Sequence, residues 1–258
     1  MNSMTANNFG LTDRDYAVLL LEDVDLEAQL LAIRSILRRH AEADAALQQE
    51  IEELAKRAGE AQGEYGMHLQ NSWVDEMHGT VFQDAAHSMA AIGMLAPLLE
   101  SLFVGVFRGI RDITPPVTPV TPTGPRAAFI ADPKFWDPHY VFGGPRREKD
   151  VVRGILQLVD STGLTPHLPA DYAAALNALF KYRNKMLHQG FEWLPSERTN
   201  FEAMIVSEGW PSDWFERSLT NGETWIIYMS DVLIRHTLTR IDEILDGIGV
   251  FIQARYPS

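Results

Sequence analysis

Residues 178–190 read ALFKYRNKMLHQG, a stretch whose apolar residues recur at the three- and four-residue spacing of a helix. Upstream, Pro169 and Asp171 are residue types that favour a first helical turn. Downstream, Gly190 suits a C-terminal cap, because glycine readily adopts the left-handed conformation of that position. The stretch therefore predicts a helix that begins near Asp171 and ends just before Gly190.

Three polar side chains interrupt the apolar stripe of this predicted helix. On a helical wheel Arg183 falls between Phe180 and Leu187, in the middle of the stripe. Asn184 and His188 lie one turn apart at its edge. An arginine that faces a core needs a carboxylate, carbonyl groups or a ligand, because a buried unpaired charge is very unfavourable. Arg183, Asn184 and His188 are therefore the candidate site residues, since local departures from a pattern are typical of functional sites.

The run Arg183-Asn184-Lys185-Met186-Leu187-His188, near a helix end and followed by Gly190, resembles the Arg-x4-6-His motif of HEPN domains. In those domains the residue after the arginine is typically polar, as Asn184 is here. The resemblance implies an all-helical bundle over residues 81–252. Many HEPN domains are metal-independent endoribonucleases that dimerise so that two motifs face each other, and others bind nucleotides, RNA or proteins without cleavage.

The resemblance also implies a role for each residue. His188 would exchange protons with the RNA 2′-hydroxyl or the leaving oxygen, Arg183 would hold the phosphate, and Asn184 would orient either group. Three neighbours are further candidates for RNA binding: Lys181, Tyr182 and Lys185. Tyr182 would either stack on a base or pack in the core. No metal or other cofactor is required. The structural alternative is that Arg183 pairs with an acid on another helix and His188 caps its own helix.

The rest of the chain predicts more helices and no strands, so the expected fold class is all-α. Residues 26–58 form a long heptad-like stripe, which indicates either a dimerising or partner-binding coiled coil or an antiparallel hairpin inside the domain. A helix over about 81–110 should be kinked at Pro97. Further helices are expected over 145–160, 196–206, 212–218 and 223–252.

A proline-rich segment interrupts these helices. Ile113 to Pro125 reads ITPPVTPVTPTGP and excludes a helix or a central strand. The aromatic residues that follow it should pack on a core and fix a loop that extends to residue 144. We therefore expect a long-helix segment over 1–66 and a HEPN-like helical domain over 67–258, interrupted by a loop at 113–144.

Composition narrows the function classes. The net charge of −13 argues against broad DNA binding, which needs a basic face, but leaves room for a small basic pocket. The chain has no cysteine and no secretory leader is evident, which favours a cytoplasmic location. Residues 89–107 are apolar over the length of a membrane span, but Glu100 near the middle favours a buried core helix and no membrane.

No metal site is expected. Five residues invite one but lack a spacing with a geometric reason: Glu64, His68, Glu76, His78 and His87. His236 and Arg240 lie on the apolar face of the last predicted helix, where His236 is a core histidine or a contributor to the Arg183 site. A cluster of three tryptophans should belong to a core or a dimer contact: Trp210, Trp214 and Trp225.

These observations give two hypotheses. The first is a HEPN-type endoribonuclease or RNA-binding effector, of a toxin or defence type, that works as a homodimer on RNA. The second is a non-catalytic helical protein that dimerises or binds a protein partner through its long N-terminal helix. An enzyme should bring Arg183, Asn184 and His188 together on an open surface, whereas an interaction protein should close Arg183 in an ion pair.

Overall fold

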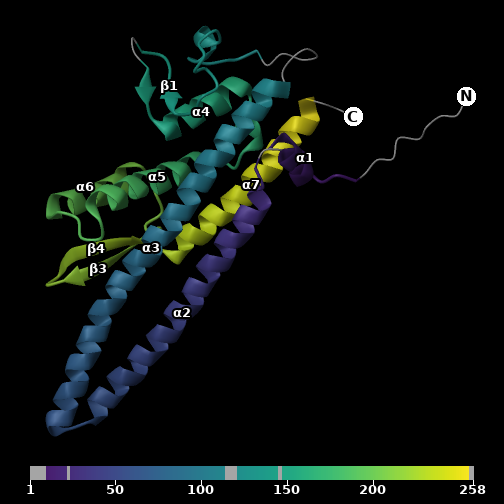
Figure 1. Cartoon of the computed structure of the whole chain (residues 1–258). Coiled ribbons are helices and arrows are strands. Elements are labelled where there is room, and N and C mark those ends of the chain that lie inside the picture. The colour runs from purple at the N-terminus through teal and green to yellow at the C-terminus, as the bar shows by residue number, and fades with distance from the viewer. Residues whose placement is uncertain (1–9, 22–23, 114–120, 145–146, 256–258) are drawn as a thin grey trace, which may run out of the picture. The chain divides into compact units, whose positions relative to one another are not determined.

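The computed structural model describes residues 10–21, 24–113, 121–144 and 147–255, and it is mainly helical, as the sequence predicts. The α-helices of these residues are α1 Asp13–Leu20, α2 Leu26–Glu60, α3 Gly63–Ile113, α4 Val151–Thr162, α5 Tyr172–Gln189, α6 Pro195–Ser207 and α7 Asp231–Arg255 (Figure 1). The strands are β1 Tyr140–Val141, β2 Glu148–Lys149, β3 Phe215–Thr220 and β4 Glu223–Met229. Short 3-10 turns lie at Ala127–Phe129 and Thr165–His167.

The chain forms two compact units, and the long helices contribute residues to both. The first unit comprises Met1–Ala28, Pro97–Asn177 and Thr237–Ser258, and the second comprises Gln29–Ala96 and Ala178–His236. This division differs from the expected parts 1–66 and 67–258. The proline-rich segment does not separate the units, since the residues on both sides of it belong to the first. Residues 114–120 of that segment lie outside the described residues.

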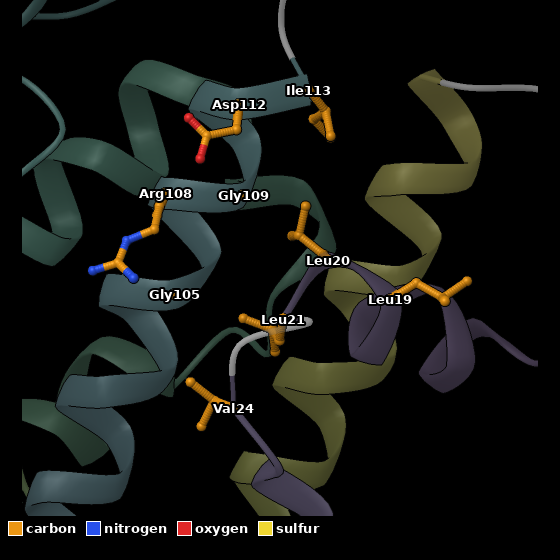
Figure 2. Close-up of a pocket in the computed structure, with 9 residues that line it drawn as sticks. All are labelled: Leu19, Leu20, Leu21, Val24, Gly105, Arg108, Gly109, Asp112 and Ile113. Carbon is orange, nitrogen blue, oxygen red and sulfur yellow. The ribbon is translucent and has the colours of Figure 1, made fainter.

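In the first unit, the end of α1 packs closely on α3. A Cβ atom on Gly109 would lie 2.6 Å from Leu20 Cγ, and one on Gly105 would lie 2.8 Å from Leu21 Cδ2. The two glycines therefore permit the contact that Figure 2 shows. Beside it is a cavity of about 220 Å³, lined by Leu19, Leu20, Leu21, Val24, Gly105, Arg108, Gly109, Asp112 and Ile113.

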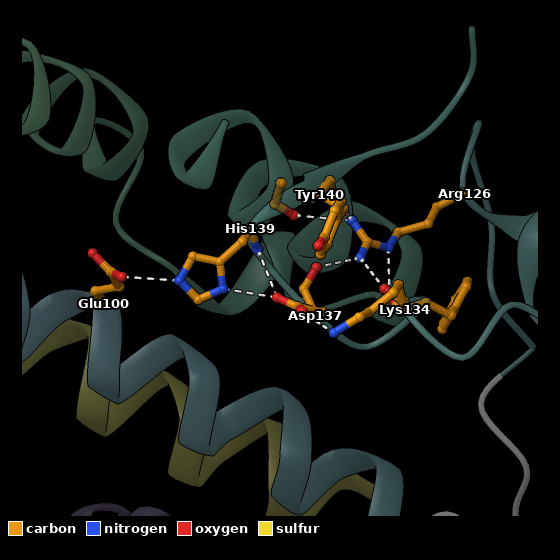
Figure 3. Close-up of polar contacts among 8 residues, drawn as sticks. Glu100, Arg126, Lys134, Asp137, His139 and Tyr140 are labelled. Carbon is orange, nitrogen blue, oxygen red and sulfur yellow. Dashed lines mark hydrogen bonds and ion pairs between the residues drawn. The ribbon is translucent and has the colours of Figure 1, made fainter. Parts of the chain in front are cut away.

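The loop before α4 is organised by one buried side chain, Arg126. Its guanidinium is fully buried and donates to the backbone carbonyls of Phe135 at 2.6 Å, Tyr140 at 2.7 Å and Asp137 at 2.8 Å (Figure 3). It also lies 4.6 Å from the ring centroid of Phe142. Burial lowers the pKa of Arg126 to about 10, so it is still charged at neutral pH. The aromatic loop is therefore fixed on a core, as expected.

Helix α4 begins later than the sequence predicts. It was expected from about residue 145, but β2 and Asp150 come first. The Asp150 side chain accepts the backbone N–H of Arg153 at 3.0 Å, which makes it the N-cap. At the other end Gly163, with φ 76°, forms the left-handed C-cap.

In the second unit, α2 and α3 form an antiparallel hairpin, one of the two interpretations of the heptad pattern. The rings of His40 and His87, on opposite arms, lie 5.2 Å apart. Helix α3 begins at Gly63 rather than near residue 81, and it continues through Pro97. A Cβ on Gly66 would lie 2.7 Å from the Ala61 carbonyl oxygen, so this glycine allows the tight connection between the arms.

The prediction of no strands was wrong at residues 215–229. Strands β3 and β4 pair antiparallel, with Thr220 opposite Glu223. Asn221 and Gly222 between them have φ of 51° and 81°, as a two-residue hairpin turn of type I′ requires. Consequently the helix expected over 212–218 is mostly strand, and the last helix begins at Asp231 instead of Glu223.

The apolar part of α3 has the character of a core helix. It is the helix in the described ranges whose length and composition would allow it to cross a membrane, with a mean hydropathy of 1.9 over 18 residues. However, 56% of that window is buried within the protein. Ile92, Leu95, Leu102, Phe103 and Val106 are all almost fully buried.

Candidate functional site

The rotation of α5 is set by Tyr182, for which the sequence left two roles open, stacking on a base and packing in a core. Its ring is fully buried and lies 5.3 Å from Phe215, 5.8 Å from Trp193 and 6.0 Å from Phe201. Its hydroxyl donates to the Ile227 carbonyl at 3.2 Å, and burial raises its pKa well above the ordinary value. Tyr182 is thus a core residue here, and its ring is not accessible to a nucleic-acid base.

This anchor moves Arg183 off the buried face. The buried residues at this end of α5 are Ala178, Leu179, Phe180, Tyr182 and Met186, so the centre of the buried face runs through Leu179, Tyr182 and Met186, with Phe180 beside Arg183 at its edge. Arg183 is half-buried and Leu187 is 65% exposed. The helical-wheel prediction that Arg183 lies in the middle of the apolar stripe was therefore wrong. The rings around Tyr182 pack against the neighbouring face of the helix and leave Arg183 at the edge of the buried face.

Arg183 is held against its own helix by two contacts. Its Nε and Nη2 donate to Asn184 Oδ1 at 3.3 and 3.2 Å, and its guanidinium carbon lies 4.6 Å from the ring centroid of Phe180. Cation–π contacts of this kind contribute about 0.5–1 kcal/mol at exposed sites. The side chains of Arg183 and Asn184 therefore form one polar unit, with the Asn184 amide at the surface.

His188 lies one turn beyond Asn184 and is exposed. Within the described ranges its ring makes no hydrogen bond, so it does not cap its helix. That end is closed instead by Gly190, which has φ 71° and whose N–H donates to the Met186 carbonyl at 3.0 Å, confirming the predicted cap. The Trp193 indole N–H then donates to the Gly190 carbonyl at 2.8 Å. The helix end that carries His188 is consequently well fixed, while the imidazole faces solvent.

The two lysines of the motif differ in their surroundings. Lys181 is exposed, whereas Lys185 forms an ion pair with Glu197 at the start of α6. Helix α5 has no acidic residue of its own, so it is a local basic segment on an acidic chain. The charge of Lys185 is offset by Glu197, whereas Lys181, Asn184 and His188 lie at the surface.

The remaining sequence candidates contact residues outside the motif. The ring of His236 lies 5.1 Å from that of Trp214, which is buried. Arg240 forms ion pairs with Asp171 at 2.9 Å and with Glu243. Trp210 is also in the aromatic core, as the sequence suggested.

A cluster of ionisable groups around Asp84 was not singled out from the sequence. Burial, aided by Asp44, Glu216 and Asp231, raises the pKa of Asp84 to about 6. His87, one turn along α3, is buried with its Nδ1 unpartnered among the described residues, and burial lowers its pKa. No three His, Asp or Glu side chains in the described ranges are placed to hold a metal ion. The cluster joins residues from four elements, so no local motif could reveal it.

Comparisons add no family to this picture. No protein-family model, curated protein or solved structure matches the chain. The HEPN resemblance therefore rests on residues 183–190 and on the helical fold.

Proposed function

We propose that the protein is a HEPN-type, metal-independent ribonuclease whose site is formed by Arg183, Asn184 and His188. The observation that supports this most is the division of α5 into two faces. Tyr182 and Met186 are buried, while Asn184 and His188 lie exposed one turn apart. Asn184 and His188 are thus exposed to solvent, with the half-buried Arg183 bound to Asn184, on a helix that is anchored in the core through Tyr182.

The proposed reaction uses the RNA's own nucleophile. His188 accepts the proton of a 2′-hydroxyl, whose oxygen then attacks the adjacent phosphorus. The bond from phosphorus to the 5′-oxygen breaks and that oxygen takes a proton from water, giving a 2′,3′-cyclic phosphate and a 5′-hydroxyl end. Arg183, oriented by Asn184 and Phe180, donates to the phosphate oxygens where negative charge builds up.

A second copy of the chain would complete the site in this proposal. Leu187, between Asn184 and His188, is 65% exposed, and Leu194 beyond the helix end is 63% exposed. These leucines give the motif an apolar surface on which the same helix of a partner could pack, bringing two motifs together. A cytoplasmic toxin or defence role follows from the HEPN resemblance and is part of the proposal.

The test is cleavage of mixed single-stranded RNA in EDTA by the wild type and by His188→Ala, with folding matched by circular dichroism. We expect His188→Ala to lose about 10²–10⁴-fold in rate, the usual contribution of a general acid or base. His68→Ala, which removes another exposed histidine, is the matched control and should cut like the wild type. An RNA with one 2′-deoxy residue should resist cleavage at that position.

Two results would overturn the proposal. One is equal cleavage by the wild type and His188→Ala, which would place any activity elsewhere. The other is a folded wild type that neither cuts nor binds the RNA, since binding through the basic α5 is also part of the proposal.

The alternative function is a non-catalytic helical interaction protein. It is favoured by the α3 arm of the α2–α3 hairpin, where Tyr65 is 65%, Met67 60%, Val74 43% and Met77 41% exposed. This hypothesis expects a folded dimer or a bound partner, no RNA cleavage, and no effect of substitutions at His188. Light scattering of Met67→Glu/Met77→Glu against the wild type tests it: an unchanged molar mass would exclude self-association through these residues.

A further inference from the structure

The imidazole of His139 lies between two carboxylates of the first unit. Its Nδ1 is 2.7 Å from Asp137 Oδ1, and its Nε2 is 2.9 Å from Glu100 Oε1 (Figure 3). Glu100 is on α3, whereas Asp137 and His139 belong to the loop before β1. The ring therefore joins that loop to the helix.

While both acids are ionised, both contacts at these distances require both ring nitrogens to carry a proton. A neutral imidazole has one N–H donor and one lone pair, so one nitrogen would face a carboxylate with its lone pair. That arrangement is repulsive, because a carboxylate oxygen only accepts. An imidazolium donates to both acids at once, in two charge-assisted hydrogen bonds.

The groups on the two sides of His139 differ in how firmly they are held. Asp137 also accepts the backbone N–H of His139 at 3.1 Å and Lys134 Nζ at 3.2 Å, and its carbonyl accepts from Arg126 at 2.8 Å. The His139 carbonyl accepts the N–H of Asp150, at the start of α4, at 3.1 Å. The loop side is thus fixed by several bonds, and the bond from the ring to Glu100 reaches α3.

The electrostatics agree with this geometry. Burial alone would lower the pKa of His139, but its hydrogen bonds with Glu100 and Asp137 outweigh burial and raise the pKa above the ordinary value. For Asp137, burial is likewise outweighed by its bonds with His139 and Lys134, which lower its pKa. The positive groups nearby, Lys134 and Arg126, contact Asp137 rather than the ring.

We propose that His139 is a pH-sensitive clasp that ties the loop over residues 126–142 to α3 while the imidazole is protonated and releases Glu100 when it is neutral. This inference is independent of any RNA chemistry at α5. Because the folded pKa of His139 is raised, the stabilisation is complete below about pH 6.5, the unfolded value. It is lost as the pH rises through the folded pKa.

The direct test is a proton–carbon NMR titration of the histidine Cε1–Hε1 signals of the whole chain from about pH 5 to pH 9, a range that brackets the ordinary histidine pKa. His139→Gln assigns the signal by its disappearance. We expect His139 to titrate above about pH 6.5, and Glu100→Gln to lower that midpoint. A midpoint at or below about 6.5 in the wild type would overturn the proposal.

A second measurement follows the consequence for folding. The urea midpoint of the wild type should fall as the pH rises through the His139 titration, and that of His139→Gln should fall less than half as far. His68→Gln, at an exposed position, is the control and should behave like the wild type. Identical pH dependence of the wild type and His139→Gln would contradict the clasp. If His139→Gln does not fold, the titrations of the wild type and Glu100→Gln decide the matter.

Discussion

Replacing Arg126 by methionine should strongly destabilise the protein. The guanidinium makes three short hydrogen bonds, to the carbonyls of Phe135, Tyr140 and Asp137, at 2.6–2.8 Å. Two longer contacts reach the carbonyls of Lys134 at 3.3 Å and Gly154 at 3.5 Å. Methionine keeps much of the apolar volume and removes every donor.

The magnitude follows from the carbonyls left behind. A buried acceptor without a partner costs about 1–3 kcal/mol, so three of them cost about 3–9 kcal/mol. The substitution also removes a buried charge, whose desolvation opposes folding, and this offsets part of that loss. We therefore expect Arg126→Met to lower the free energy of unfolding by at least about 3 kcal/mol. Arg126→Lys should fall between the wild type and methionine, because one ammonium cannot reach carbonyls on several sides.

Urea unfolding at neutral pH, followed by circular dichroism and tryptophan fluorescence, measures this difference. Arg153→Met is the control: the Arg153 side chain is 58% exposed and pairs with Glu148, so the loss should be at most about 1 kcal/mol. A loss below about 1 kcal/mol for Arg126→Met would refute the reasoning, because the carbonyls would then have found other partners. If Arg126→Met cannot be obtained in a folded form, the free energy of unfolding of Arg126→Lys is compared with that of the wild type instead.

Three further substitutions test other parts of the structure. Tyr182→Phe should cost about 1 kcal/mol in urea unfolding, because it removes the hydrogen bonds of the hydroxyl and keeps the ring; no loss would mean the hydroxyl is not bonded. Gly154→Ala should lower the free energy of unfolding by more than about 2 kcal/mol, since the added Cβ would lie 1.9 Å from the Pro138 carbonyl oxygen. A melting temperature equal to that of the wild type would contradict that contact. The folded pKa of Asp84 is raised to about 6, so its ionisation opposes folding above that pH. Asp84→Asn should therefore gain on the order of 1 kcal/mol at about pH 8 and nothing near pH 4, as unfolding curves at the two pH values will show.

The long helices were predictable because their signal is local and repeated. The apolar stripe of residues 26–58 repeats over many turns, and α2 follows it closely. The extent of α3 was not predictable in the same way. Its first turns contain Gly66 and Gly79, which weaken a helix locally, and packing in the hairpin overrides that preference.

The β3–β4 hairpin was predictable and was missed. The dipeptide Asn221-Gly222 is a strong hairpin signal, and Trp225, Ile226 and Ile227 after it are residue types common in strands. The same residues also fit the apolar face of a helix. Because a helical pattern follows directly from Asp231, they were assigned to the start of that helix. Asn221 and Gly222 favour a hairpin over a continuous helix at this position.

The orientation of α5 depends on residues far away in the sequence. Periodicity gives a helix an apolar side, but two neighbouring stripes, one through Tyr182 and one through Arg183, were both compatible with it. The choice is made by Phe215 and by the Ile227 carbonyl, 45 positions after Tyr182. For the same reason nothing local distinguishes Arg126 from an ordinary surface arginine.

Arg126 gives the loop over residues 126–142 what other proteins obtain from a bound calcium ion. A calcium site gathers backbone carbonyls around a positive charge, and the loop keeps its shape only while the ion is present. Here the positive charge is attached to the chain itself, in the middle of a ring of carbonyls. A chelator cannot remove this charge, and its presence does not depend on the calcium concentration of the surroundings. The positive charge is therefore in place among the carbonyls whenever the loop is folded.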